Sequence, residues 1–90
     1  MNNYQYKIQL SDLGLCATLD YFGFPIVETM QDPQDTTKVI MVFNKTKDIE
    51  ELIKGYWSGS VAVEPKRFWS ITRDIKSRIR GNHLGRKNNN

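Results

Sequence analysis

Lys38-Val39-Ile40-Met41-Val42-Phe43-Asn44 is the strongest β-strand signal in this chain of 90 residues. Residues 39–43 form an unbroken apolar run, and branched and aromatic side chains of this kind favour extended backbone. A strand that is apolar on both sides is typical of the centre of a sheet, where both faces are covered. We therefore predict a central, covered strand over residues 38–44.

The segments before this strand predict a hairpin and one more strand. Asp32-Pro33-Gln34-Asp35 is typical of a turn, because proline presets one backbone dihedral angle and aspartate bonds to its own backbone. The turn would join residues 38–44 to a strand over residues 24–31. Near the start of the chain, residues 4–10 alternate apolar and polar side chains, which indicates a half-buried strand.

Helix signals lie on either side of the predicted hairpin. Ser11 offers a hydroxyl that would cap a first helix, and Gly23 is placed to end it in a left-handed conformation. Thr46 or Asp48 would cap a second helix, which Gly59 closes. Apolar side chains spaced i, i+3, i+4 and i+7 predict the buried face of this second helix: Ile49, Leu52, Ile53 and Tyr56.

A third helix is predicted from Pro65, which suits the first turn of a helix, to Gly81. Residues 60–63 would add a short strand before it. The core face of this third helix would be formed by side chains within about 80° of one another around the helix axis: Phe68, Ile71, Ile75 and Ile79.

The resulting element order is β-α-β-β-α-(β)-α, with the short strand in brackets. This order predicts an α+β fold in which helices pack on a three- or four-stranded, mainly antiparallel sheet, with the strand order left open. We expect a single domain over residues 1–81 and a flexible, basic, asparagine-rich tail over residues 82–90.

Charge is distributed unevenly along the chain, although its net value is only +3. Residues 1–64 carry five lysines against nine acidic residues, a net charge of −4. Residues 65–90 carry eight lysines and arginines against Asp74 alone, a net charge of +7. Such asymmetry predicts an anionic partner for the C-terminal segment.

Basic side chains gather on one flank of the predicted third helix. They lie about 80–160° from Phe68 around the axis, whereas Arg67 and Arg78 lie on the opposite flank. Cations in such a stripe would neutralise the phosphates of DNA or RNA, and a tryptophan among them would stack on a base. The alternative is a solvated, structural stripe, because cations suit a helix C-terminus and their stems cover apolar surface. The candidate nucleic-acid contacts, two of them in the tail, are Lys66, Trp69, Arg73, Lys76, Arg80, Arg86 and Lys87.

The end of the second helix is a candidate protein contact, formed by Tyr56 and Trp57. Tyr56 continues the apolar face, and Trp57 is one step around the helix. An exposed Trp57 would mark a site of protein interaction. We favour the alternative, in which Trp57 packs in the core or against the helix end.

Residue types suited to catalysis or metal binding are sparse. His83, the only histidine, falls in the predicted tail, where nothing holds it near a partner. Cys16, the only cysteine, lies in an apolar helix with Asp12 and Asp20 one turn away, so a buried, unreactive thiol is expected. Zinc- or calcium-ligand spacing and a glycine-rich phosphate loop are absent from the sequence. We therefore expect no enzymatic activity, no metal and no cofactor.

The sequence predicts no secretion signal and no membrane span. A charged start followed by an apolar run is missing, as is any stretch of about 20 apolar residues. With a single cysteine, the expected location is the cytoplasm. A homodimer is compatible with this small size, because association enlarges the core.

The sequence resembles a family of short bacterial, archaeal and phage proteins classified only as a domain of unknown function. The likeness covers roughly residues 5–80. It implies a small prokaryotic or mobile-element protein and assigns no activity and no catalytic residues. The features that match are the helix ending in Gly23-Phe24, the strand end Val42-Phe43-Asn44, the block Tyr56-Trp57-Ser58-Gly59, Val63-Glu64-Pro65 and Lys76-Ser77-Arg78.

Two functions are compatible with these patterns. The first is a small, non-enzymatic accessory protein that binds nucleic acid through its basic C-terminal helix and tail. The alternative is a protein-interaction module, such as an inhibitor or adaptor of a phage or mobile element, which acts through a sheet edge or an exposed aromatic.

Overall fold

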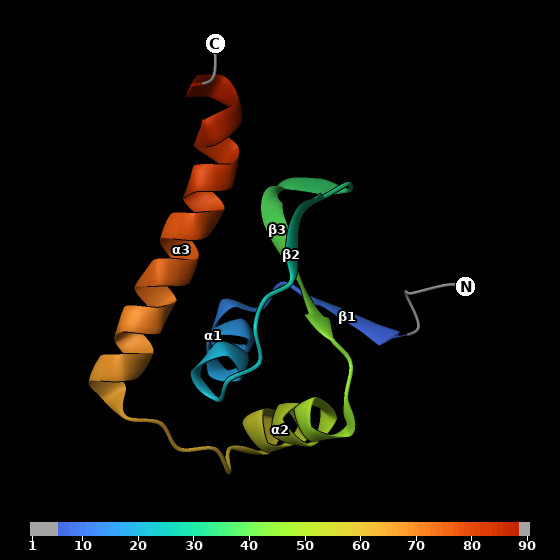
Figure 1. The fold of residues 1–90 in the computed structure, drawn as a ribbon, viewed down its shortest axis with the longest axis vertical. Coiled ribbons are helices and arrows are strands. Elements are labelled where there is room, and N and C mark those ends of the chain that lie inside the picture. The colour runs from blue at the N-terminus through green and yellow to red at the C-terminus, as the bar shows by residue number, and fades with distance from the viewer. Residues whose placement is uncertain (1–5, 89–90) are drawn as a thin grey trace.

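A computed structural model describes residues 6–88 of the chain, with side chains described from Tyr6 to Gly81. The elements follow the predicted order except for the bracketed strand, and the α+β class is confirmed (Figure 1). They are β1 (Lys7–Leu10), α1 (Leu13–Tyr21), β2 (Glu28–Asp32), β3 (Asp35–Asn44), α2 (Lys47–Ser58) and α3 (Pro65–Asn88).

Within the described residues, β3 is the central strand of a three-stranded antiparallel sheet with the order β1-β3-β2. Ile8 of β1 lies opposite Phe43, and Thr29 of β2 lies opposite Met41. The predicted turn joins β2 to β3, and in it the backbone N–H of Gln34 donates to the Asp32 carboxylate at 2.8 Å. The central position predicted for the apolar run is therefore confirmed.

The core lies on one face of this sheet. Met41 and Phe43 point into it and are almost fully buried. Val42 points to the opposite face, where it is only 3% exposed. Gln9 and Glu28 lie directly opposite Val42 on the two neighbouring strands. The buried helix residues that join Met41 and Phe43 in one cluster are Leu15, Cys16, Ala17, Leu19, Ile49 and Ile75.

The described helices thus cover one face of β3, whereas covering of both faces was predicted. On the other face, Val42 is 3% exposed and lies outside the core cluster that the helices form with the sheet. Cross-strand neighbours directly opposite a residue lie about 5 Å away on the same face, and for Val42 these are Gln9 and Glu28.

The helix ends are set by the expected residue types, with one shift. Asp12 caps α1 in place of Ser11, because its carboxylate accepts the N–H of Leu15 at 3.0 Å and a negative charge suits a helix N-terminus. Thr46 caps α2, accepting the N–H of Ile49 at 3.1 Å. Gly23 and Gly59 follow with φ values of +96° and +77°, so both end helices in the left-handed conformation as predicted.

The predicted starts of β2 and β3 are wrong, and so is the bracketed strand. β3 begins at Asp35, three residues before the predicted Lys38. β2 begins at Glu28 and not at residue 24, because the chain is still leaving α1 there and the N–H of Phe24 donates to the Leu19 carbonyl. Residues 60–63 form no strand. The backbone N–H of Ser60 is instead used to close α2, donating to the Gly55 carbonyl at 3.0 Å.

The third helix does not end at Gly81, because α3 continues to Asn88. One glycine costs a helix only about 1 kcal/mol relative to alanine, which is too little to stop it. The predicted tail therefore overlaps helical backbone over residues 82–88, and its flexibility stays a prediction. Despite this length, no helix within residues 6–88 is apolar enough to cross a membrane.

Candidate nucleic-acid interface

The N-terminus of α3 is fixed by Glu64. Its carboxylate accepts the backbone N–H groups of Lys66 at 3.0 Å and Arg67 at 2.8 Å. These two bonds hold the pKa of Glu64 below its ordinary value, because they favour the charged carboxylate. The backbone N–H of Glu64 in turn donates to the hydroxyl of Tyr21 on α1 at 3.0 Å. The start of α3 is therefore tied to the end of α1.

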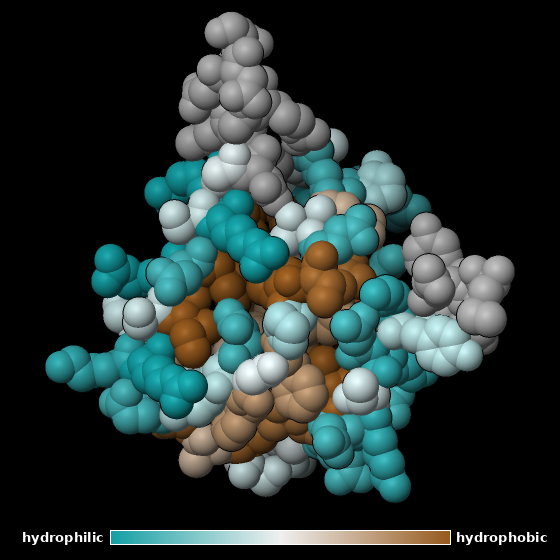
Figure 2. Space-filling view, in the orientation of Figure 1, coloured by the Kyte–Doolittle hydropathy of each residue, from teal (hydrophilic) through white to brown (hydrophobic). Residues whose placement is uncertain are grey.

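One face of α3 packs against the rest of the molecule, as predicted. Ile75 is 2% exposed within the core cluster, and Phe68, Ile71 and Ile79 are partly buried against it. α3 stands along one side of the molecule next to α1 (Figure 1). Figure 2 shows hydrophobic side chains gathered between α3 and the sheet, with hydrophilic ones along the outer side of α3. This packing fixes which flanks of α3 face solvent.

Two arginines on one flank of α3 are occupied by the fold. The Arg67 guanidinium lies 4.6 Å from the centre of the Tyr21 ring. Arg78 donates to the Ile26 carbonyl at 3.4 Å, and its charge also acts on Asp20 of α1. Burial raises the pKa of Asp20, Arg78 lowers that pKa, and Asp74 raises it. These two cations therefore help to hold α3 in place.

The opposite flank of α3 carries a second set of cations with no acidic partner. The basic stripe is defined here as Lys66, Trp69, Arg73, Lys76 and Arg80. All five side chains are exposed, and Trp69 is 59% exposed. Between Tyr6 and Gly81, the ion pair formed is Lys45–Glu50 at 3.5 Å, so no stripe cation is neutralised by a described acid. Arg86 and Lys87 have side chains outside the described residues.

The basic stripe has one internal contact and a shallow hollow. The Lys76 ammonium lies 6.0 Å from the centre of the Trp69 ring. Further along α3 is a depression of about 350 Å³. Asp74 is one of its lining residues and offsets part of the positive charge there. The residues that line the depression are Arg73, Asp74, Lys76, Ser77 and Arg80.

Residues 5–81 match a family described as a domain of unknown function, DUF5659. The chain belongs to this family. The resemblance to a domain of unknown function is thereby confirmed. The DUF5659 match contains the whole basic stripe but ends before Arg86 and Lys87. Comparisons with curated proteins and with solved structures find no significant match.

Trp57 is the other exposed tryptophan of this DUF5659 domain. Its side chain is 65% exposed at the end of α2, so the packed position that the sequence favoured is wrong. The ring meets Tyr56 edge to face, with 4.9 Å between ring centres. Tyr56 is half-buried against the core, because Gly14 leaves room for it; a Cβ at Gly14 would come within 2.6 Å of the Tyr56 hydroxyl. Trp57 therefore projects from an anchored neighbour.

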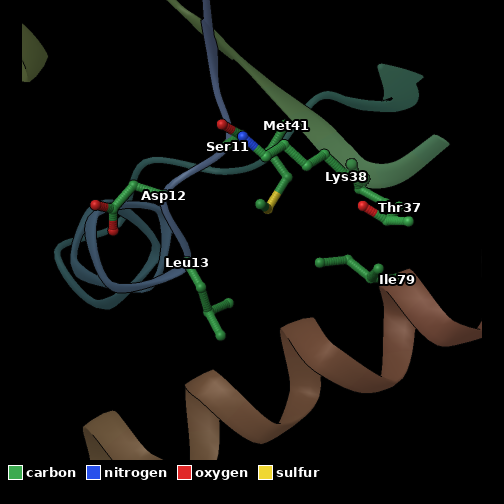
Figure 3. Close-up of a pocket in the computed structure, with 8 residues that line it drawn as sticks. Ser11, Asp12, Leu13, Thr37, Lys38, Met41 and Ile79 are labelled. Carbon is green, nitrogen blue, oxygen red and sulfur yellow. The ribbon is translucent and has the colours of Figure 1, made fainter. Parts of the chain in front are cut away.

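A pocket of about 480 Å³ lies where α1, β3 and α3 of the DUF5659 domain meet (Figure 3). Leu13, Met41 and Ile79 project toward its centre from these three elements. Its charged groups are Lys38 and Asp12, and Asp12 already caps α1. The pocket could not be predicted from the sequence, because its lining comes from three distant segments with no local motif to mark it.

Cys16 is a buried core residue in this DUF5659 domain, as predicted. It is 0% exposed, and burial, with a smaller effect of Asp12, raises the pKa of its thiol to about 12. His83 has a side chain outside the described residues. Among the described residues, no group of three or more His, Cys, Asp or Glu side chains is placed to hold a metal ion.

Proposed function

We propose that this protein is a small, non-enzymatic accessory protein of the cytoplasm that binds nucleic acid through α3. One observation carries the proposal: the basic stripe combines four exposed cations, which pair with no described acid, with an exposed tryptophan. Such cations neutralise phosphates and release the counterions condensed on them, which is the main source of affinity for nucleic acid.

The length of the stripe suits a polyanion better than a single small anion. Lys66 and Arg80 are 14 residues apart, which corresponds to about 21 Å along a helix at about 1.5 Å per residue. A nucleic-acid backbone presents many phosphates over that distance, whereas a small anion would meet one or two cations. Arg86 and Lys87 would extend the same charge if α3 presents them alike.

Stabilisation of the helix dipole does not account for the stripe. Cations are favourable in the last turn of a helix and unfavourable in the first. Lys66 and Arg67 stand in the first turn of α3, which contains no acidic residue. Arg67 has a structural contact on α1, but Lys66 has no side-chain partner among the described residues. Binding of Lys66 to an anionic partner outside the fold would account for a cation at this position.

The proposal is tested with a triple variant, R73A/K76A/R80A, in a fluorescence anisotropy titration. The probe is a labelled oligonucleotide of about 20 nucleotides, used single-stranded and as a duplex, at about 50 mM salt. We expect a loss of at least about tenfold in affinity, because three phosphate contacts disappear. Circular dichroism would check that the fold is kept.

A matched control removes the same charge elsewhere. K38A/K47A/K54A replaces three lysines that are exposed on β3 and α2, so its net charge equals that of the test variant. If both triple variants bind equally, affinity follows net charge and not the stripe. If R73A/K76A/R80A binds as tightly as the unchanged protein, the proposal is wrong.

Exposed Trp57 supports a second candidate function. A protein-interaction module, such as an inhibitor or adaptor of a phage or mobile element, would use an exposed tryptophan beside an anchored Tyr56 as a contact. The edges of β1 and β2 offer another contact. A partner captured from lysate after nuclease treatment and in high salt, and lost from W57A, would favour this function over the first.

A further inference from the structure

We infer that the basic stripe binds single-stranded nucleic acid in preference to duplex, with Trp69 as the platform on which an unpaired base stacks. This inference rests on the proposed function and adds the form of nucleic acid that the site takes. It concerns the chemistry common to single-stranded DNA and RNA, an unpaired base between two phosphates.

Trp69 does not belong to the core face of α3. It is 59% exposed, whereas the neighbouring Phe68 packs against the core. A single exposed apolar residue is ordinary on a protein surface. What distinguishes Trp69 is its position within the stripe and not its exposure alone.

Cations flank Trp69 on both sides along the helix. Lys66 stands three residues before it and Arg73 four residues after it, so each lies about one turn away on the same flank. Lys76 is held over the ring at 6.0 Å, near the outer limit of about 6 Å for a cation–π contact. The indole therefore lies between positive charges and is only weakly held by its own neighbour.

This arrangement matches one nucleotide of a single strand. Its base would stack on the indole, and the phosphates before and after it would reach Lys66 and Arg73. The depression continues the same path toward the C-terminus of α3, with three cations against one acidic side chain in its lining: Arg73, Lys76 and Arg80 against Asp74. Stacking on an aromatic ring needs no particular base, so little sequence preference is expected.

A duplex cannot use the indole in the same way. Its bases are paired and stacked on one another, and an enzyme or binding protein must unstack a base before it can contact the ring face. Trp69 projects from the side of a helix whose core face is packed, with no described partner element to help extrude a base. A duplex would therefore meet the cations of the stripe but not the tryptophan.

The test compares W69A, W69F and W57A against three labelled probes of about 12 nucleotides, a length within the site sizes of single-strand binders. The probes are oligothymidylate, oligouridylate and an A·T duplex. W57A is the matched control, because Trp57 is exposed to a similar degree but lies on α2. Similar affinities for the first two probes would place both DNA and RNA among the ligands, and a difference would identify the one preferred.

We expect W69A to weaken single-strand binding by roughly 5- to 150-fold, which is the change in affinity that corresponds to losing the stacking of one base. Duplex binding should change by less than about twofold, W69F should retain much of the single-strand affinity, and W57A should bind as the unchanged protein does. In a W57F background, Trp69 fluorescence should be quenched by oligothymidylate and not by the duplex.

The outcomes separate this inference from the proposed function. If W69A loses nothing, or loses single-strand and duplex binding equally, the stacking inference is overturned. In that case a loss of binding in R73A/K76A/R80A would still support the stripe as a phosphate site. If the unchanged protein binds none of the three probes, both the inference and the proposed function are wrong.

Discussion

The Arg67 guanidinium lies 4.6 Å from the centre of the Tyr21 ring, and this contact joins the first turn of α3 to the last residue of α1. Tyr21 also accepts the backbone N–H of Glu64 at 3.0 Å through its hydroxyl. One tyrosine thus holds both the residue that caps α3 and a cation of its first turn.

Replacing this tyrosine should destabilise the protein in two separable steps. Tyr21→Phe removes the hydroxyl acceptor and should lower the free energy of unfolding by about 0.5–1.5 kcal/mol. Tyr21→Leu also removes the ring under Arg67, which should cost about 0.5–1 kcal/mol more. Urea denaturation followed by circular dichroism measures both steps. Equal stability of the two variants would show that the Arg67 contact contributes nothing.

Arg67 and Arg73 should have opposite roles, although both are exposed arginines of α3. Arg67→Ala should lower stability and leave oligonucleotide binding unchanged, because its guanidinium is engaged by α1. Arg73→Ala should lower affinity and leave stability unchanged. Parallel urea and anisotropy titrations of the two variants check this division, and it is refuted if both variants lose affinity to the same extent.

The Glu64 cap should make stability depend on acid pH. Its pKa is lowered in the folded protein from an ordinary value of 4.5 by the N–H groups of Arg67 and Lys66. A carboxylate with a lowered folded pKa binds protons more tightly when unfolded, so its contribution is full above pH 4.5 and is lost as the pH falls through the folded pKa. The stability difference between the unchanged protein and Glu64→Gln should therefore shrink on acidification below that value.

Urea titrations of the unchanged protein and of Glu64→Gln at a series of pH values measure this difference. A Glu64→Gln difference that stays constant across the acid range would contradict a charged cap at the start of α3.

Cys16 should be protected from thiol reagents while the protein is folded. With a thiol pKa of about 12 against an ordinary 9.0, the thiolate fraction at pH 8 falls by about a thousandfold, and burial excludes the reagent as well. Reaction with Ellman's reagent should be slow in buffer and fast in denaturant. Rapid reaction in buffer would mean that α1 opens easily or that the thiol is not in the core.

Binding to duplex DNA should depend on salt with a slope that counts the stripe cations. If the four described cations of the stripe each neutralise one phosphate, a plot of log K against log[salt] should have a slope of about −3.6 for duplex and about −2.8 for a single strand. Lys76→Ala should reduce the magnitude of each slope by the contribution of about one phosphate contact. Arg78→Ala should leave it unchanged, because Arg78 is turned toward Ile26.

The fold was predictable to the extent that signals were local and strong. The apolar run of β3, the turn at Asp32 and the glycines that end α1 and α2 each have one dominant physical cause, and each is found in the structure. Failures came where two causes of similar size compete. Ser11 and Asp12 are both good caps one residue apart, and Gly81 weakens a helix without forbidding it.

The sequence predicted which residues of the candidate site share one flank of α3, but not how exposed their side chains are. Helical spacing alone places Trp69 beside Arg73 and Lys76, but it says nothing about which flank α1 covers. Trp57 shows the same limit: its place on α2 was clear, whereas its 65% exposure depends on how Tyr56 docks beside Gly14. Helical spacing also separates Arg67 and Arg78 from the stripe, but their contacts with Tyr21 and Ile26 depend on the tertiary structure.

Val42 lies between Gln9 and Glu28 on the face of the sheet opposite the core, and this position bears on self-association. Gln9 and Glu28 are the cross-strand neighbours of Val42, and the apolar positions on that face continue through Ile40 beside Met30. Replacing Gln9 or Glu28 by serine would shorten a side chain beside Val42 and expose more of this apolar face. Exposed apolar faces of a sheet favour association with other copies of the protein. We therefore expect self-association of this protein to depend on the length of these two side chains as well as on charge.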